Sequence, residues 1–163
     1  MPVFYSAVEV IEMAVRTEES GKVFYEGVAQ RTKQAELKKL FTFLAGEEAK
    51  HQEVFFDLYK TIKDNPQAVP YDWEEMSLYL KALTESKFFL GKDKAINLVK
   101  EARTPKQALD FALDFERETM LFYTEIMALV AEKSRDVVAK IIAQEKSHIR
   151  QLQALKESLS KRK

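Results

Sequence analysis

The sequence predicts an all-α protein, a four-helix bundle made of two antiparallel helical hairpins joined by a long crossover that carries a short helix. Three observations lead to this prediction. The chain of 163 residues contains only four glycines and four prolines, and three of the prolines lie between residues 65 and 105. On either side of that segment, apolar residues recur at helical spacing over long stretches. The segment itself is long enough to cross the whole bundle, so the second hairpin can enter from the opposite end.

Helix-start signals define the first hairpin. Ser6 and Glu9 have the spacing of a capping box, which predicts that the first helix begins there and extends to about Thr32. The second helix is expected over residues 34–64. The loop between them, "TKQA", is short, and short loops join antiparallel neighbours.

The second hairpin carries similar signals. Thr104 is followed by Pro105 at the first helical position and by Gln107 three residues on, so the third helix is predicted to begin there and to continue to about Glu132. The short loop "AEKS" then leads into a fourth helix, expected over residues 134–160. These two helices should also be antiparallel neighbours.

The crossover, residues 65–104, is expected to hold one short helix, because Asp72 followed by Glu75 has the spacing of a helix start. The length of the chain fits one domain with one core, and we predict a single domain over residues 1–163.

Composition excludes several classes of partner and site. Lysine plus arginine equals aspartate plus glutamate, at 26 each, so no net charge attracts nucleic acid or an anionic membrane. The chain has no cysteine, which excludes disulfides, thiolate nucleophiles and cysteine-held zinc or iron–sulfur sites within it. The apolar opening is interrupted by Glu9 and Glu12 and lacks the basic start of a signal peptide. We therefore expect a soluble cytoplasmic protein with no nucleic-acid and no membrane partner.

The two hairpins repeat one sequence pattern. The stretch "TEESGKVFY" aligns with "FERETMLFY", and "LAGEEAKH" aligns with "IIAQEKSH". These alignments pair four sets of polar or aromatic residues: Glu18 with Glu116, Tyr25 with Tyr123, Glu48 with Glu145, and His51 with His148. The repeat predicts two hairpins related by a pseudo-twofold axis.

Helical phase predicts which carboxylates face the core. Steps of three and four residues from Glu18 meet apolar residues, whereas the same steps from Glu19 meet charged ones. The same test places the other three paired glutamates on apolar stripes. The only two histidines of the chain each follow a stripe glutamate by three residues and share its face. Within each hairpin these groups are about equally far from the loop, so we expect all six to converge in the middle of the bundle.

A cluster of four buried carboxylates needs compensating positive charge. A single glutamate on an apolar stripe usually turns outward to water, and a lone Glu-x-x-His motif often occurs by chance. Four converging carboxylates, however, would repel one another and lose hydration, or would have to take up protons. Two divalent cations balance four carboxylates, and oxygen ligands with one imidazole per metal suit iron(II) or manganese(II). We therefore predict a dinuclear metal site with two iron ions, or with manganese in their place.

The quoted residues resemble a known family. One glutamate from each of two helices, with Glu-x-x-His from each of the other two, resembles the ligand set of ferritin-like diiron-carboxylate bundles. Within that group, "RTEESGKVFYEGVAQRTKQAELKKLFTFLAGEEAKHQEVF", "ALDFERETMLFY" and "IIAQEKSH" resemble the two hairpins of rubrerythrins. The resemblance covers both hairpins, and the crossover matches less specifically.

The resemblance implies roles for individual residues. It implies that Glu18 and Glu116 are terminal ligands and that Glu48 and Glu145 are bridging ligands. His51 and His148 would bind one metal each. Tyr25 and Tyr123 resemble tyrosines that lie behind the ligands in this family, which makes them candidate catalytic residues. From the sequence alone they could equally be core aromatics.

The sequence also departs from the family. Full-length rubrerythrins carry a rubredoxin-like iron centre held by cysteines, and without cysteines this chain would need an external electron-donor protein. Rubrerythrins place an extra glutamate three residues after the third-helix ligand, where it takes part in a ligand exchange during the peroxidase cycle. This chain has Thr119 there. The symmetric position in the first helix is Gly21, which we interpret as allowing close helix approach.

Three functions are open at this point. The first, implied by the resemblance, is a diiron-carboxylate oxidoreductase that reduces hydrogen peroxide or O2, as a peroxidase or ferroxidase. The second is a non-enzymatic iron- or manganese-binding protein for metal storage or sensing. The third is a structural bundle without metal. A cluster of aromatic residues in the second helix is interpreted as core or as an interface, and we expect a homodimer or higher homo-oligomer.

Overall fold

The computed structural model describes residues 6–64, 72–84 and 91–162. These residues form six α-helices and no strand, which confirms the all-α prediction. Their bounds are α1 Ala7–Arg31, α2 Ala35–Asp64, α3 Trp73–Thr84, α4 Lys92–Glu101, α5 Pro105–Ile126 and α6 Glu132–Ser160.

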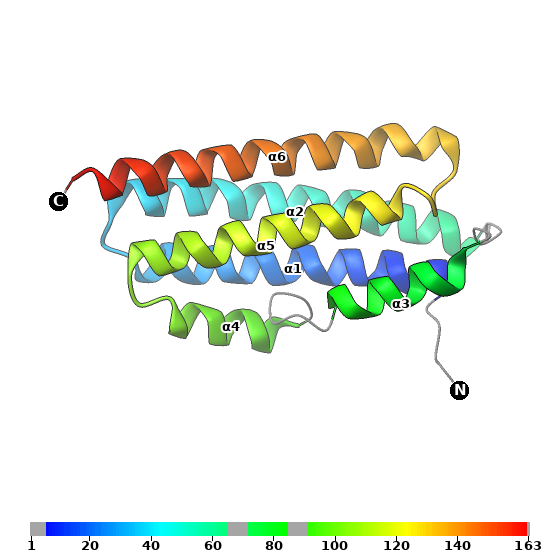
Figure 1. The fold of residues 1–163 in the computed structure, drawn as a ribbon, viewed down its shortest axis with the longest axis horizontal. Helices are drawn as coiled ribbons and strands as arrows, with labels where there is room; N and C mark the ends of the chain where they lie inside the picture. Colours follow the sequence, from blue (N-terminus) through cyan, green and yellow to red (C-terminus); the bar gives the residue numbers. More distant parts are fainter. Residues whose placement is uncertain (1–5, 65–71, 85–90, 163) are drawn as a thin grey trace.

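The four long helices form a bundle of two antiparallel hairpins, α1 with α2 and α5 with α6 (Figure 1). The loop between α1 and α2 lies at one end of the bundle, and the loop between α5 and α6 lies at the other. The crossover therefore runs back along the bundle, as the sequence predicts. This arrangement makes each long helix antiparallel to the two helices beside it.

Both predicted capping boxes form. The Ser6 hydroxyl accepts a hydrogen bond from the Glu9 backbone N–H at 3.2 Å, and the Ser6 N–H donates to the Glu9 carboxylate at 2.6 Å. At the start of α5, Thr104 and Gln107 exchange the same pair of bonds, with Pro105 at the first helical position. Each box satisfies N–H groups that would otherwise lack a partner at a helix start.

The predicted boundary between the third and fourth long helices is wrong by several residues. Instead of continuing to about Glu132, α5 ends at Ile126, and α6 already begins at Glu132. The intervening chain turns tightly, with Leu129 N–H donating to the Ile126 carbonyl. This turn brings Leu129 and Val130 into the core, and burial of their side chains favours the early end of α5 over another helical turn.

The crossover holds two described helices rather than the single one predicted. The expected helix is α3, beginning just after Asp72. The second is α4, whose apolar face packs against α1. Arg31 of α1 donates to the Val99 carbonyl, and a Cβ added at Gly27 would lie 2.6 Å from Val99 Cγ2. Both prolines of the crossover, at positions 66 and 70, lie outside the described residues.

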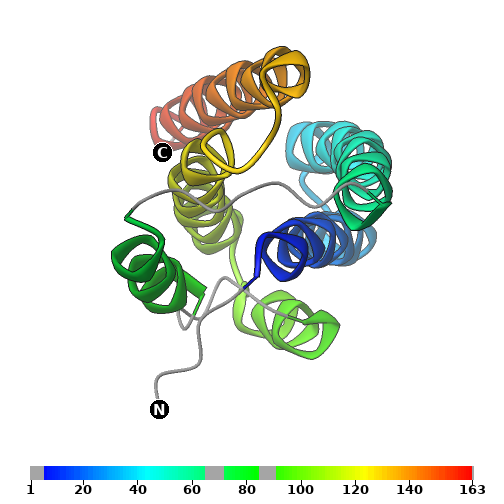
Figure 2. The ribbon, with the colours of Figure 1, turned by 90° about the vertical axis from the view of Figure 1, so that its right-hand side faces the viewer.

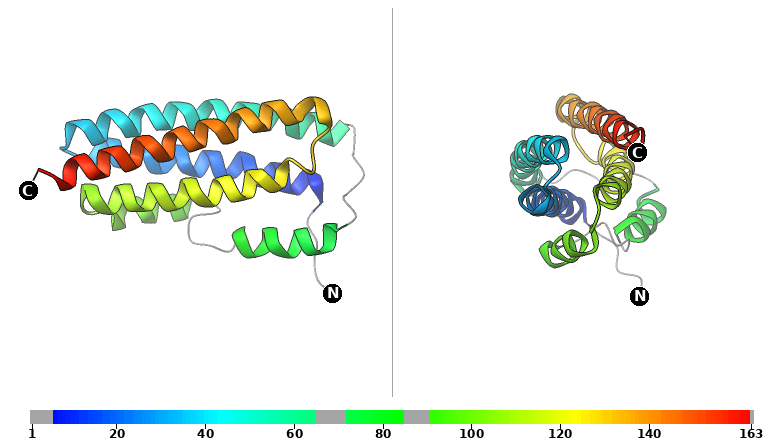
Figure 3. Two further views of the ribbon diagram at one scale, coloured as in Figure 1. Left: turned by 45° about the horizontal axis from the view of Figure 1, so that its top comes forward. Right: turned by 90° about the vertical axis from the view of Figure 1, so that its left-hand side faces the viewer.

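End views show where α3 and α4 lie (Figures 2 and 3). Both lie on the side of the bundle formed by α1 and α5, with α3 against α5 and α4 against α1. Within the described chain, no helix covers the opposite side, formed by α2 and α6. The two sides of the bundle therefore differ in their covering.

Two apolar clusters fill the interior, one on each side of the bundle's middle. One contains Tyr25 and Phe41, and the other contains Phe55 and Tyr123. Two further aromatic residues of α2 point outward, because Phe43 is 47% and Phe56 48% exposed. The cluster read from the sequence is thus part core and part surface, and the expected homo-oligomer stays a prediction.

No described helix is long and apolar enough to cross a membrane. The single domain over residues 1–163 also stays a prediction.

Candidate metal centre

A cluster of buried polar side chains occupies the gap between the two apolar clusters. Each of the four long helices contributes to it, and all six side chains that the sequence singled out are present: Glu18, Glu48, His51, Glu116, Glu145 and His148. The four glutamates have no exposed surface, and each histidine is 2% exposed. The predicted convergence at mid-bundle is confirmed.

The six side chains form two overlapping groups of four. One group contains Glu18 and His51, the other contains Glu116 and His148, and both contain Glu48 and Glu145. In each group, one ligand-type atom per residue lies within 4.8 Å of all the others. We call Glu48 and Glu145 the shared carboxylates. Two groups with two carboxylates in common have the connectivity of a dinuclear site.

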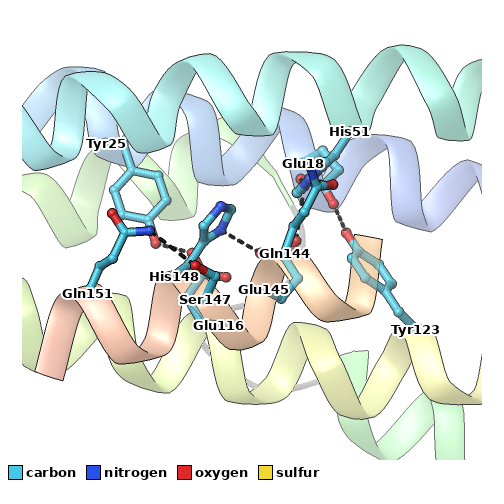
Figure 4. A network of polar contacts seen from close by, with 10 residues as sticks. All are labelled: Glu18, Tyr25, His51, Glu116, Tyr123, Gln144, Glu145, Ser147, His148 and Gln151. Atoms are coloured by element: carbon cyan, nitrogen blue, oxygen red, sulfur yellow. Dashed lines mark hydrogen bonds and ion pairs between the residues drawn. The ribbon is translucent and has the colours of Figure 1, made fainter. Parts of the chain in front are cut away.

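The histidine rings turn their Nδ1 atoms toward the carboxylates (Figure 4). His148 Nδ1 lies 2.8 Å from Glu145 Oε2 and 3.7 Å from Glu116 Oε1. His51 Nδ1 lies 3.0 Å from Glu145 Oε1 and 3.6 Å from Glu18 Oε2. The two rings stack at 5.8 Å between centroids. Both imidazoles therefore contact the same shared carboxylate, Glu145.

A contact on the far side of one ring holds its orientation. His51 Nε2 lies 3.1 Å from the Gln144 side-chain oxygen, so Nε2 carries a proton when it donates there. That leaves Nδ1 of a neutral ring free to act as a ligand. The sequence does not indicate this role of Gln144, because its contact crosses from α6 to α2 and no spacing within one helix signals it.

The two tyrosines cross from one hairpin to the other. Tyr25 of α1 donates to Glu116 of α5 at 2.5 Å, and Tyr123 of α5 donates to Glu18 of α1. Both rings are fully buried, and burial together with the neighbouring carboxylates raises the pKa of each tyrosine well above its usual value. Both tyrosines are thus core aromatics that also contact the carboxylate cluster, and their catalytic role stays a prediction.

Charge is unevenly distributed over the cluster. Burial, and then the neighbouring Glu18 and Glu145, raise the pKa of Glu48 well above its usual value. Burial raises the pKa of Glu116 to about 8, with a further contribution from Glu145. Glu145 behaves oppositely: although burial raises its pKa, contacts with His148 and His51 lower it to about 2.

Without a bound metal, both histidines would hold their protons strongly. Burial lowers the pKa of His51, but the contacts with Glu145 and Glu18 outweigh it and raise the value to about 11. The same balance, with Glu116 and Glu145 as partners, raises the pKa of His148 to about 9. Protons thus supply the positive charge that the carboxylates need.

The cluster leaves many ligand-type atoms without a hydrogen bond from the described residues. They are both oxygens of Glu48, Oε2 of Glu18 and Glu116, Oε1 of Glu145 and Nδ1 of His51. The last two lie 3.0 Å apart as an ion pair, but without the geometry of a hydrogen bond. Unsatisfied buried polar atoms are costly, so a cluster of them indicates a missing partner. Carboxylate oxygens and imidazole nitrogens are the donors that iron(II) and manganese(II) accept. The residues present therefore fit a pair of such ions.

Two positions beside the cluster differ between the hairpins. A Cβ added at Gly21 would lie 2.6 Å from Glu48 Oε2 and 2.8 Å from the Phe115 ring. The space that a side chain at Gly21 would fill is thus occupied by side chains of α2 and α5. The close helix approach inferred from the sequence stays a prediction. Its counterpart Thr119 is fully buried. Glu19, which the phase test placed off the stripe, pairs at the surface with Lys92 at 3.0 Å.

Comparisons with known proteins agree with this geometry. No curated protein matches the chain. The crystal structure of a candidate ferritin-like diiron-carboxylate protein from Thermotoga maritima is similar, with a TM-score of 0.67 and 27% sequence identity. The similarity covers 96% of this chain and 98% of that chain. The rubrerythrin family model matches residues 9–156, and the chain therefore belongs to the rubrerythrin family.

Proposed function

We propose that this protein is a diiron-carboxylate oxidoreductase that reduces hydrogen peroxide or O2 at a buried dinuclear iron site. The observation that carries the proposal is the pair of overlapping four-residue groups, with two shared carboxylates and buried ligand atoms that lack partners. Family membership supports iron as the metal, and manganese fits the same donors.

The proposed ligand roles follow the two groups. Glu18 and His51 would hold one iron, and Glu116 and His148 the other. The shared carboxylates Glu48 and Glu145 would bridge the two. Four carboxylates and two divalent ions then leave no net charge in the buried cluster, which removes the electrostatic cost of the metal-free form.

Two iron(II) ions bound there would supply the two electrons that, with two protons, reduce one molecule of hydrogen peroxide to two of water. The protein's part is to hold the ligands and to keep bulk water out. Tyr25 and Tyr123 donate to Glu116 and Glu18, which fixes the orientation of both proposed terminal carboxylates. Their phenolic protons also lie next to the cluster, so we propose them as catalytic residues.

Metal binding must displace protons from the cluster. Burial raises the pKa of Glu48 and of Glu116, and close carboxylates raise the pKa of both histidines, so the metal-free site is partly protonated at neutral pH. Ligands bind in their deprotonated forms, and loading therefore releases protons. The chain has no cysteine-held iron centre, so we also propose that an external donor protein returns the electrons.

The test is anaerobic reconstitution with iron(II), followed by rapid mixing with peroxide and, separately, with O2. The proposal predicts about two iron ions per chain and stoichiometric oxidation in a single turnover. Full loading with no oxidation by either oxidant would overturn the oxidoreductase and leave the metal-storage or metal-sensing alternative. No uptake of iron or manganese would overturn both.

A further inference from the structure

Thr119 of α5 has a buried hydroxyl that the described chain does not satisfy. Its side chain has no exposed surface, and its Oγ1 has no hydrogen-bond partner among the described residues. A buried hydroxyl without a partner is costly, because it gives up its hydrogen bonds to water on folding. A partner other than the described residues is therefore expected to bind next to it.

Other helical threonines satisfy their hydroxyls locally. Thr17, Thr42 and Thr124 each donate to the carbonyl four residues earlier. Thr17 is the closest match to Thr119, since it is also fully buried. This local bond is commonly made by threonine within a helix, yet Thr119 does not make it. Its hydroxyl is available to another acceptor or donor.

Two lines of geometry place this hydroxyl beside the metal centre. Thr119 follows Glu116 by three residues and precedes Tyr123 by four, so it shares their face of α5. Glu116 belongs to the cluster, and Tyr123 donates into it. In the other hairpin, the matching position is Gly21, where an added Cβ would lie 2.6 Å from Glu48 Oε2. A side chain at Gly21 would thus meet a shared carboxylate, and the repeat of the two hairpins gives Thr119 the equivalent position beside the cluster.

We propose that the Thr119 hydroxyl donates a hydrogen bond to the small oxidant that the metal centre receives. This inference rests on the proposed function, because the oxidant binds only where the metals are. An uncharged hydroxyl suits this role, since it can donate a proton into a hydrogen bond without adding a fifth negative charge to four buried carboxylates. Thr119 contacts the substrate and is not itself a metal ligand.

Azide, a small anion, serves as the probe. Its affinity for the diiron(III) protein is measured by titration for the wild type and for Thr119→Val, which replaces the hydroxyl by a methyl group. We expect Thr119→Val to weaken azide binding about tenfold, the loss of one hydrogen bond to an anion, while the iron content stays at the wild-type value. Thr119→Ser should restore most of the affinity.

Thr17→Val is the matched control. It removes a buried threonine hydroxyl that has a partner within the chain, and azide affinity should stay at the wild-type value. A second measurement needs no metal: Thr119→Val should melt at or above the wild-type temperature in the metal-free form, since it removes an unsatisfied group.

The outcomes separate the two proposals. Full iron loading with unchanged azide affinity in Thr119→Val overturns this inference and leaves the proposed function standing. A metal-free Thr119→Val protein that melts well below wild type also overturns it, because the hydroxyl would then have a structural partner. A wild-type protein that takes up no metal overturns the proposed function and this inference together.

Discussion

The two hairpins supply equivalent donors to the centre, but their shared carboxylates are in opposite states. In the second hairpin, Glu145 contacts both histidines, and although burial raises its pKa these contacts lower it to about 2. In the first hairpin, neither oxygen of Glu48 has a hydrogen-bond partner among the described residues, and burial raises its pKa well above the usual value. The pseudo-twofold relation of the donors therefore does not extend to the protons. The shifts favour the charged form of Glu145 and the neutral form of Glu48.

The largest expected effect comes from removing the charge of each shared carboxylate in turn. Glu145→Gln should destabilise the metal-free protein by about 3 kcal/mol, because two buried protonated histidines lose their common partner. Glu48→Gln should cost less than about 1 kcal/mol, because burial and the neighbouring carboxylates already favour the neutral form of Glu48. Both variants should lose the dinuclear site. Denaturant unfolding of the metal-free proteins and metal analysis of the reconstituted ones measure the two effects.

Glu19→Gln is the control for these substitutions. Glu19 is next to Glu18 in the sequence, but its carboxylate pairs with Lys92 at the surface. The substitution should therefore change the free energy of unfolding by no more than about 0.5 kcal/mol and leave the metal content unchanged. Equal destabilisation by Glu48→Gln and Glu145→Gln would show that the two carboxylates share the charge evenly.

The next effect is on pH dependence. The pKa of Glu116 rises from 4.5 to about 8 on folding, and that of Glu48 also rises. Unfolding therefore releases protons from these carboxyl groups at pH values between 4.5 and about 8. The histidines, with folded pKa values of about 11 and about 9 against 6.5, add to this release above pH 6.5. The metal-free protein should therefore lose stability steadily from pH 5 to pH 8.

Metal replaces these protons, so the gap in melting temperature between the loaded and metal-free proteins should widen over the same range. The lowered pKa of Glu145 works in the opposite direction only below about pH 4.5, outside this window. Melting curves at matched pH values test this, and a constant gap from pH 5 to pH 8 would contradict it.

The smallest expected effect comes from substitutions at Gly21 and at its matching position, Thr119. Gly21→Ala should destabilise the protein by about 1–2 kcal/mol and reduce metal loading, because the new methyl group meets Glu48 Oε2 and the Phe115 ring. Thr119→Ala, at the matching position of the second hairpin, removes atoms and should leave metal content unchanged. If Gly21→Ala binds as much metal as the wild type, Glu48 does not need the space beside Gly21 in order to bind metal.

The sequence could predict what a single helix encodes. Spacing of three and four residues placed Glu18 inward and Glu19 outward, and capping boxes at Ser6 and Thr104 located two helix starts. The early end of α5 was missed because it depends on burying Leu129 and Val130, which is decided by packing. The contact between Gln144 and His51, and the contrast between Glu48 and Glu145, depend on distances between helices. No periodicity along one helix carries that information.

Neither group of four comes from one hairpin. Each draws three residues from one hairpin and a single shared carboxylate from the other. Each bound ion would therefore cross-link the two hairpins and close the chain loop that the crossover forms between them. Contacts are also denser within the hairpins than between them. Loss of metal would therefore require the hairpins to part, at least locally. The rate at which a chelator removes the metal would then be limited by that opening, and it would measure the rate at which the two hairpins separate.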